Sequence, residues 1–114
     1  MVTVEDVRAL ASTLPRSTEH LIHDRVKFRV GSIVYVAFSK DETEMGFAFP
    51  KEERDALVHG DPETFRLPDT SDLRFNWVVV RVDRIGVDEM RELVLDAWRT
   101  VVPQKVVAEY EARA

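Results

Sequence analysis

The sequence contains no cysteine. Disulfide bonds, thiolate catalysis and zinc or iron–sulfur sites with cysteine ligands are therefore excluded. The four glycines stand apart from one another at predicted turns, so there is no glycine-rich loop of the kind that cradles phosphate groups. We find no low-complexity tract and no internal repeat, which argues against a long linker and against a repeat architecture.

Long apolar segments are missing as well. No apolar run approaches the roughly 18 residues that a membrane span requires. Residues 1–10 carry acids before any basic residue and lack the apolar core of a signal peptide. We therefore expect a cytoplasmic protein with no membrane partner. The length suits one domain, which we place over residues 1–114.

The spacing of apolar residues alternates along the chain between a helical and a strand-like period. Val4, Val7 and Leu10 recur at helical spacing, whereas Val26 and Phe28 alternate with cations, as in a strand with one buried side. The predicted elements, in chain order, are a helix from Thr3 to Leu14, strands at 26–30, 33–38 and 45–49, a helix from Pro50 to Gly60, strands at 64–67 and 75–83, a helix from Asp88 to about Val101, and a closing helix after Pro103.

The predicted strands arrive in runs rather than in alternation with helices. This order favours an α+β fold, because a parallel sheet needs a crossover connection between consecutive strands. We predict a two-layer fold with a mostly antiparallel, five-stranded sheet covered by helices. Its element order is α-βββ-α-ββ-α, with a short additional helix at the end.

The stretch RVKFRVG, residues 25–31, places three cations at alternate positions. Arg25, Lys27 and Arg29 would project from one side of a strand about 6.6 Å apart. This spacing is close to the phosphate spacing along one nucleic-acid strand, so these residues are candidates for phosphate contacts. The overall net charge of −5 works against such binding. The alternative is a solvated sheet face, or an edge strand whose charges prevent aggregation.

A second candidate surface lies on the predicted strand at 75–83. Phe75, Trp77, Val79 and Arg81 would share one face of this strand. An aromatic ring beside an arginine is typical of platforms on which single-stranded nucleic acid stacks, so Trp77 and Arg81 are further candidates for nucleic-acid binding. Packing in the core is the competing interpretation for Trp77.

No catalytic or metal-binding pattern stands out. His20 and His23 would point to opposite faces of an extended segment and converge only in a helical turn, so we expect no metal site. The serines occur in no nucleophile motif, and the 21 acidic residues are too numerous for any one pair to be distinctive. We therefore expect a protein that is not an enzyme and that needs no cofactor.

A series of short motifs runs through nearly the whole chain. They are Leu14-Pro15 with Glu19, Phe28-Arg29-Val30, Tyr35, Pro50 with Glu52-Glu53, Trp77-Val78, the run from Asp88 to Leu93, Ala97-Trp98, and Pro103 with Lys105. In their order and spacing these motifs resemble the MmcQ/YjbR-like family of small bacterial proteins. At the first hairpin turn, relatives often carry Gly-Lys where this chain has Gly31-Ser32-Ile33.

This resemblance implies an α+β fold with a secretion-chaperone-like topology. It also implies DNA binding through a double-wing arrangement of hairpins, and it brings no catalytic residue. Three hypotheses follow: a non-enzymatic DNA-binding module, a protein-interaction module, or a small-molecule-binding domain with a pocket between sheet and helices. The acidic segment 41–63 suits a basic partner and supports the second of these.

Overall fold

Six strands, four α-helices and two short 3-10 turns make up residues 1–113, the part of the chain that the computed structural model describes. In chain order they are α1 (Val4–Ala11), β1 (Ser17–Ile22), β2 (Arg25–Val30), β3 (Ile33–Phe38), β4 (Glu44–Ala48), α2 (Lys51–Gly60), β5 (Phe65–Arg66), η1 (Thr70–Asp72), β6 (Trp77–Arg81), η2 (Val82–Arg84), α3 (Val87–Arg99) and α4 (Gln104–Arg113). The predicted α+β class is confirmed, with one strand more than predicted. None of these helices has the length and apolarity to cross a membrane.

The first helix begins where its capping residues predict. The backbone N–H of Thr3 donates to Asp6 Oδ2 at 3.0 Å, and the Thr3 hydroxyl accepts from the backbone N–H of Asp6 at 3.3 Å. This reciprocal pair is a capping box. The helix ends at Ala11, before the predicted Leu14. After Ala11 the chain tightens into i→i+3 hydrogen bonds, from Thr13 N–H to the Leu10 carbonyl at 2.9 Å and from Leu14 N–H to the Ala11 carbonyl at 3.1 Å, and Pro15 keeps Leu14 out of helical geometry.

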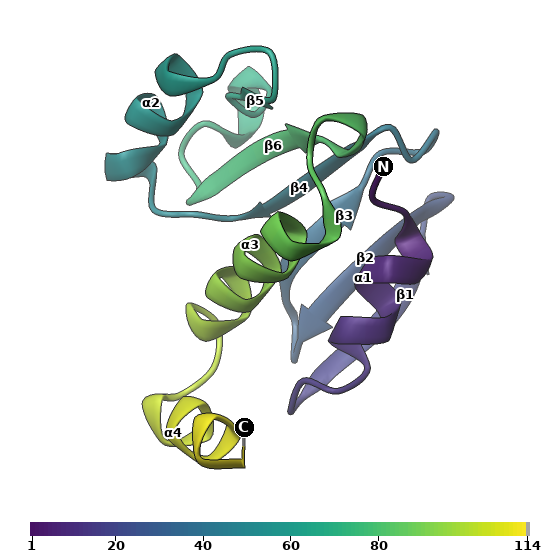
Figure 1. The fold of residues 1–114 in the computed structure, drawn as a ribbon, viewed down its shortest axis with the longest axis vertical. Helices are drawn as coiled ribbons and strands as arrows, with labels where there is room; N and C mark the ends of the chain where they lie inside the picture. Colours follow the sequence, from purple (N-terminus) through teal and green to yellow (C-terminus); the bar gives the residue numbers. More distant parts are fainter. Residues whose placement is uncertain (114) are drawn as a thin grey trace.

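The strands form one sheet in the order β1-β2-β3-β4-β6-β5, with every neighbouring pair antiparallel (Figure 1). The strand missed from the sequence is β1, at the edge of the sheet. Its sequence STEHLI is mostly polar, so it has no clear apolar alternation. His23 and Asp24, with φ of 52° and 62°, form the tight turn into β2. Two consecutive residues with positive φ are the signature of a type I′ hairpin turn.

The strand β6 is shorter than the predicted run at 75–83. The backbone N–H of Phe75 donates to the carbonyl of Asp72 at 3.0 Å, which closes a turn instead of joining the sheet. At the other end, Val82 already belongs to η2. The prediction that Phe75 shares a strand face with Trp77 is therefore wrong, and the Phe75 side chain is 50% exposed in the loop before β6.

The helices α1 and α3 cover one face of the sheet (Figure 1). The largest side chains buried in the core are Trp98 of α3, Tyr35, Phe28, Phe38 and Phe47. The helix α2 lies beside β6 and β5. Among residues 1–113, no helix covers the other face of β2, β3 and β4. We call this surface the helix-free face.

Candidate functional site on the helix-free face

A groove of about 540 Å³ lies on the helix-free face. Three of the five candidate residues from the sequence line it together: Arg25 and Lys27 of β2, and Trp77 of β6. Arg29 and Arg81 do not line it. The fold thus joins the cationic strand and the aromatic strand, which are separate candidates in the sequence, into one concave site.

Small residues form the floor of the groove between β2 and β6. The opposed residues across the sheet are Lys27 with Ala37, Ala37 with Gly46, and Ala48 with Trp77. Residues directly opposite in antiparallel strands have their side chains on the same face. Between Lys27 and the indole, Ala37 of β3 and Ala48 of β4 line the groove with short side chains, which leaves the surface hollow there, and Ile33 and Val34 of β3 line it as well.

The Trp77 indole is seated on Gly46. A Cβ atom at position 46 would lie 2.7 Å from both Cε2 and Cζ2 of the indole, so no larger residue fits beneath the ring in its present position. Gly46 is buried, whereas Trp77 stays partly exposed. Trp98 contrasts with it, since Trp98 is fully buried and donates from Nε1 to the carbonyl of Pro15 at 2.9 Å. Trp77 therefore packs on the sheet surface instead of in the helix-covered core.

A buried arginine holds the segment that leads into Trp77. Arg54 of α2 is only 8% exposed. Its Nη2 donates to the carbonyl of Leu73 at 2.6 Å, and its Nη1 donates to the carbonyls of Phe75 at 2.9 Å and Trp77 at 3.4 Å. These carbonyls satisfy the guanidinium in place of a carboxylate. Arg54 thereby fixes the wall of the groove, a role that the charged pattern KEERD of its helix does not reveal.

The cations of β2 have no acidic partner. Among residues 1–113, no carboxylate lies within 4.0 Å of the charged groups of Arg25, Lys27 or Arg29. Arg25 Nε donates to the carbonyl of Phe38 at 2.9 Å, which orients the side chain without neutralising its charge. The positive charge of this strand is therefore available to an anion.

Arg29 is placed differently from the other two cations. A β-bulge shifts the register of β2 against β3 between Phe28 and Arg29. Arg29 lies toward β1, where its Nη2 is 3.3 Å from the ring nitrogens of His20. Its Nε is buried and has no hydrogen-bond partner in the described part of the chain. Arg29 thus extends the basic strand away from the groove.

Arg81 does not add to the basic surface of the groove. Its guanidinium pairs with Asp83 at 3.2 Å and lines a separate cavity of about 460 Å³. Arg84, which lines the same cavity, pairs with Glu63 at 3.1 Å. The two arginines at this end of the sheet are therefore neutralised by neighbouring acids, in contrast to the cations of β2.

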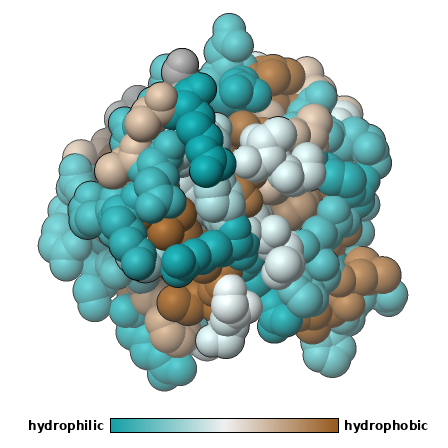
Figure 2. Space-filling view, turned by 90° about the horizontal axis from the view of Figure 1, so that it is seen from below, coloured by the Kyte–Doolittle hydropathy of each residue, from teal (hydrophilic) through white to brown (hydrophobic). Residues whose placement is uncertain are grey.

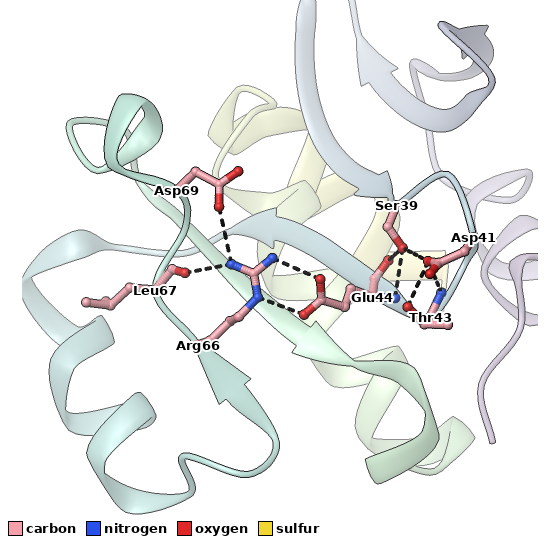
Figure 3. A network of polar contacts seen from close by, with 7 residues as sticks. All are labelled: Ser39, Asp41, Thr43, Glu44, Arg66, Leu67 and Asp69. Atoms are coloured by element: carbon pink, nitrogen blue, oxygen red, sulfur yellow. Dashed lines mark hydrogen bonds and ion pairs between the residues drawn. The ribbon is translucent and has the colours of Figure 1, made fainter.

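A closed network of polar side chains joins the β3–β4 turn to β5 (Figure 3). Arg66 donates from Nε to Glu44 Oε2 at 2.7 Å and from Nη2 to Glu44 Oε1 at 2.9 Å, and its Nη1 donates to the carbonyl of Leu67. Hydrogen bonding by Arg66 is the main reason that the pKa of Glu44 lies below its ordinary value. Asp69 also approaches Arg66 at 3.7 Å. Each charge here has a partner, so the network stabilises the fold and offers little to a ligand.

The turn between β3 and β4 is organised by Asp41. Its Oδ1 accepts hydrogen bonds from the hydroxyls of Thr43 and Ser39, both at 2.8 Å, and from the backbone N–H of Thr43 at 3.2 Å (Figure 3). The Thr43 hydroxyl is the largest cause of the lowered pKa of Asp41, followed by that of Ser39. The carboxylate of Asp41 is thus occupied by its own turn.

Two acids line the side of the groove away from β2. Glu52 lies in the first turn of α2, and Asp72 lies at the end of η1. Neither forms an ion pair with another residue among 1–113. The groove therefore carries both cations from β2 and acids from α2 and η1, and Arg25 and Asp72 also line a smaller pocket of about 90 Å³ together. Figure 2 views the molecule from below and shows exposed apolar residues in separate patches between hydrophilic ones.

Histidines and acids do not gather into a metal site. In the described part of the chain, no three of these side chains lie close enough together to hold an ion. His20 contacts the Thr18 hydroxyl at 2.9 Å through Nε2, and His23 lies in the turn that follows β1. The two histidines of the sequence motif thus have separate surroundings.

Comparison with known proteins covers most of the chain. Residues 12–100 match the model of the YjbR family. The crystal structure of Deinococcus radiodurans protein DR2400, with a DUF419 domain, has the same fold, with a TM-score of 0.77 at 22% sequence identity, over 92% of this chain and 82% of that chain. The comparison with curated proteins finds no match.

Proposed function

This chain belongs to the YjbR family, and from this premise we propose that it is a non-enzymatic DNA-binding module whose contact surface is the helix-free face of the sheet. Arg25, Lys27 and Arg29 contact phosphates, and Trp77 lies in the groove beside them. The observation that carries the proposal is the row of three cations without a carboxylate partner, in a chain whose net charge is −5.

The arrangement of these charges suits a linear polyanion. Cations at alternate positions of one strand repel each other. Elsewhere on the molecule a neighbouring acid neutralises a cation, as Asp83 does for Arg81. A phosphate backbone supplies regularly spaced negative charges that several cations contact at once. Each neutralised phosphate releases condensed counterions, which supplies most of the affinity of sequence-independent binding. The acidic remainder of the surface limits contact to this face.

The proposal sets the size of the expected salt effect. Three phosphate contacts on duplex DNA give a slope of about −2.7 for the logarithm of the binding constant against the logarithm of the salt concentration. The affinity should therefore fall roughly 40-fold between 50 mM and 200 mM NaCl. Binding of this kind is weak, with dissociation constants on the order of 10⁻⁴ to 10⁻⁶ M at physiological salt.

The experiment is a fluorescence-anisotropy titration of a labelled 20-base-pair DNA duplex at 50 mM and 200 mM NaCl. We expect Lys27→Glu to abolish measurable binding at 200 mM NaCl. The matched control is Arg91→Glu, which makes the same charge change at an exposed position of α3, in the helix layer. It should weaken binding less than threefold. Absence of any complex with the wild-type protein at 50 mM NaCl would overturn the proposal, as would equal effects of the two variants when both have wild-type circular dichroism.

A further inference from the structure

Within this proposed function, on which the inference rests, the groove differs in chemistry from the basic strand beside it. Its floor includes the short apolar side chains of Ala37 and Ala48, and its wall is the partly exposed indole of Trp77. A phosphate backbone alone would not need an aromatic wall or an apolar floor. We propose that the groove holds one unpaired nucleotide of a DNA single strand, with its base stacked on Trp77.

The indole of Trp77 is held in place and stays partly exposed, as stacking of a base requires. Its edge at Nε1, Cε2 and Cζ2 lies against Gly46, and the Arg54 guanidinium donates to the carbonyl of Trp77 at 3.4 Å. The ring is therefore fixed against the sheet while it remains partly exposed. Base-aromatic stacking of this type is tolerant of sequence, because every base has a π face.

The groove carries charges of both signs. Arg25 and Lys27 of β2 line it together with Glu52 of α2 and Asp72 of η1. The strands β2 and β6 are three strand spacings apart, about 14 Å. A nucleotide has the matching polarity, since its phosphate is anionic and the amino groups of its base are hydrogen-bond donors that carboxylates accept. The groove thus suits a phosphate on β2 and a base directed toward β6.

A duplex fits this surface poorly. In a duplex the faces of the bases are covered by their neighbours, so Trp77 would have no ring to stack on. The second strand would also bring further phosphates toward Glu52 and Asp72, neither of which has a cationic partner in the described residues to offset the repulsion. A single strand avoids both costs, because its phosphates stay on β2.

The experiment compares three probes at 50 mM NaCl: a labelled 12-mer of deoxythymidine, a 12-base-pair duplex, and free thymidine monophosphate as a competitor. We expect the wild-type protein to bind the single strand about tenfold more tightly than the duplex. Trp77→Ala should weaken single-strand binding about tenfold, the effect of losing one stacked base. The same variant should leave duplex binding within twofold, and Trp77→Phe should retain most of the single-strand affinity.

A matched control and a direct optical signal complete the design. Leu21→Ala removes an exposed apolar side chain of β1, outside the groove, and should leave both affinities unchanged. The single strand should quench the fluorescence of the wild-type protein but not that of Trp77→Phe, in which only the buried Trp98 emits. The quenching is measured in the wild-type protein, so it tests the contact between the base and Trp77 even if Trp77→Ala folds poorly.

The outcomes separate the two proposals. If neither DNA probe binds, the DNA-binding function fails. If single strand and duplex bind equally and the oligonucleotide causes no quenching, the function stands and the nucleotide groove is wrong. If free thymidine monophosphate displaces the labelled strand with an affinity equal to that of the 12-mer, the groove is a small-molecule site and the inference is overturned.

Discussion

The edge of the Trp77 indole formed by Nε1, Cε2 and Cζ2 lies against Gly46 of the neighbouring strand, so close that a Cβ atom there would be 2.7 Å from two ring carbons. This contact holds the aromatic wall of the groove against β4. It also explains why β4 carries a glycine in the middle of a buried strand, a position at which glycine usually costs stability.

Gly46→Ala should therefore displace the indole. The added methyl group needs space that the ring occupies, so either Trp77 rotates outward or β4 moves away from β6. Overpacking of this kind lowers the free energy of unfolding by about 1–3 kcal/mol. Urea unfolding at pH 7 measures the loss, and a red shift of the tryptophan emission reports the increased exposure of Trp77.

The matched control is Gly60→Ala at the end of α2. A Cβ atom at position 60 would meet no atom within 4 Å, and the residue is helical. Alanine is favoured over glycine in a helix by up to about 1 kcal/mol, so this variant should be as stable as the wild type or slightly more stable. Equal losses in both variants would contradict the contact between Trp77 and Gly46.

Arg54→Met should disorder the wall of the groove. The variant keeps the length of the apolar stem but leaves the carbonyls of Leu73, Phe75 and Trp77 without their donor. Buried carbonyls without partners cost about 1–3 kcal/mol each, and water reaches some of them, so we expect a total loss of about 2–4 kcal/mol. Chemical denaturation gives the free energy, and hydrogen exchange should rise in residues 69–77.

The control for this variant is Arg91→Met on the exposed side of α3. The Arg91 side chain makes no hydrogen bond or ion pair within residues 1–113. Its replacement should change stability by no more than about 0.5 kcal/mol, as is usual for surface positions. If Arg54→Met were equally mild, the three hydrogen bonds of Arg54 would not be holding the loop.

Most of the fold could be predicted because its elements have strong periodic signals. Val26 and Phe28 alternate with cations in β2, and Met90, Val94 and Trp98 form the buried stripe of α3. The edge strand β1 could not, because most of its residues are polar, Glu19 pairs with Arg8 of α1, and no apolar pattern marks the strand. Its existence depends on pairing with β2, which is a tertiary effect.

The candidate site could be predicted only in pieces. Arg25, Lys27 and Trp77 are visible in the sequence as cationic and aromatic positions, but their convergence depends on β4 lying between β3 and β6 in the sheet. Arg54 is hidden in a charged helix and becomes recognisable only by its burial. Gly46 carries no signal in the sequence, because nothing there indicates that a distant indole lies above it.

Glu44→Gln should weaken the protein at neutral pH and have less effect in acid. Arg66 lowers the pKa of the Glu44 carboxyl below its ordinary value of 4.5 in the folded state. A lowered pKa stabilises the fold fully above the unfolded value and loses this effect as the pH falls through the folded value. Both groups are partly exposed, so the expected difference at pH 7 is only about 0.5 kcal/mol.

Unfolding curves between pH 7 and pH 3 test this sign. The difference between wild type and Glu44→Gln should be constant down to about pH 5 and then shrink. Glu89→Gln, at an exposed carboxylate of α3 without an ion pair among residues 1–113, is the control and should show no such trend. A difference that grows in acid would contradict the pairing of Glu44 with Arg66.

Tyr35→Phe tests a buried pair of hydroxyls that links β3 to β1 across β2. The Tyr35 hydroxyl lies 2.6 Å from Ser17 Oγ, and the tyrosine side chain is fully buried. Removing the phenolic hydroxyl leaves Ser17 without this partner, which should lower the free energy of unfolding by about 1 kcal/mol at pH 7. Ser17→Ala removes the same hydrogen bond from the other side and should cost a similar amount.

The two variants should separate at alkaline pH. Burial raises the pKa of Tyr35 above its ordinary value of 10.0. A group whose neutral form is favoured by folding contributes stability below the unfolded pKa and loses it as the pH rises through the folded pKa. Wild type and Ser17→Ala, which both keep the phenol, should therefore lose stability above pH 10, while Tyr35→Phe lacks this contribution. In urea titrations from pH 8 to pH 11, the difference in the free energy of unfolding between wild type and Tyr35→Phe should shrink as the pH rises. A constant difference would mean that the phenol ionises as easily in the folded chain as in the unfolded one.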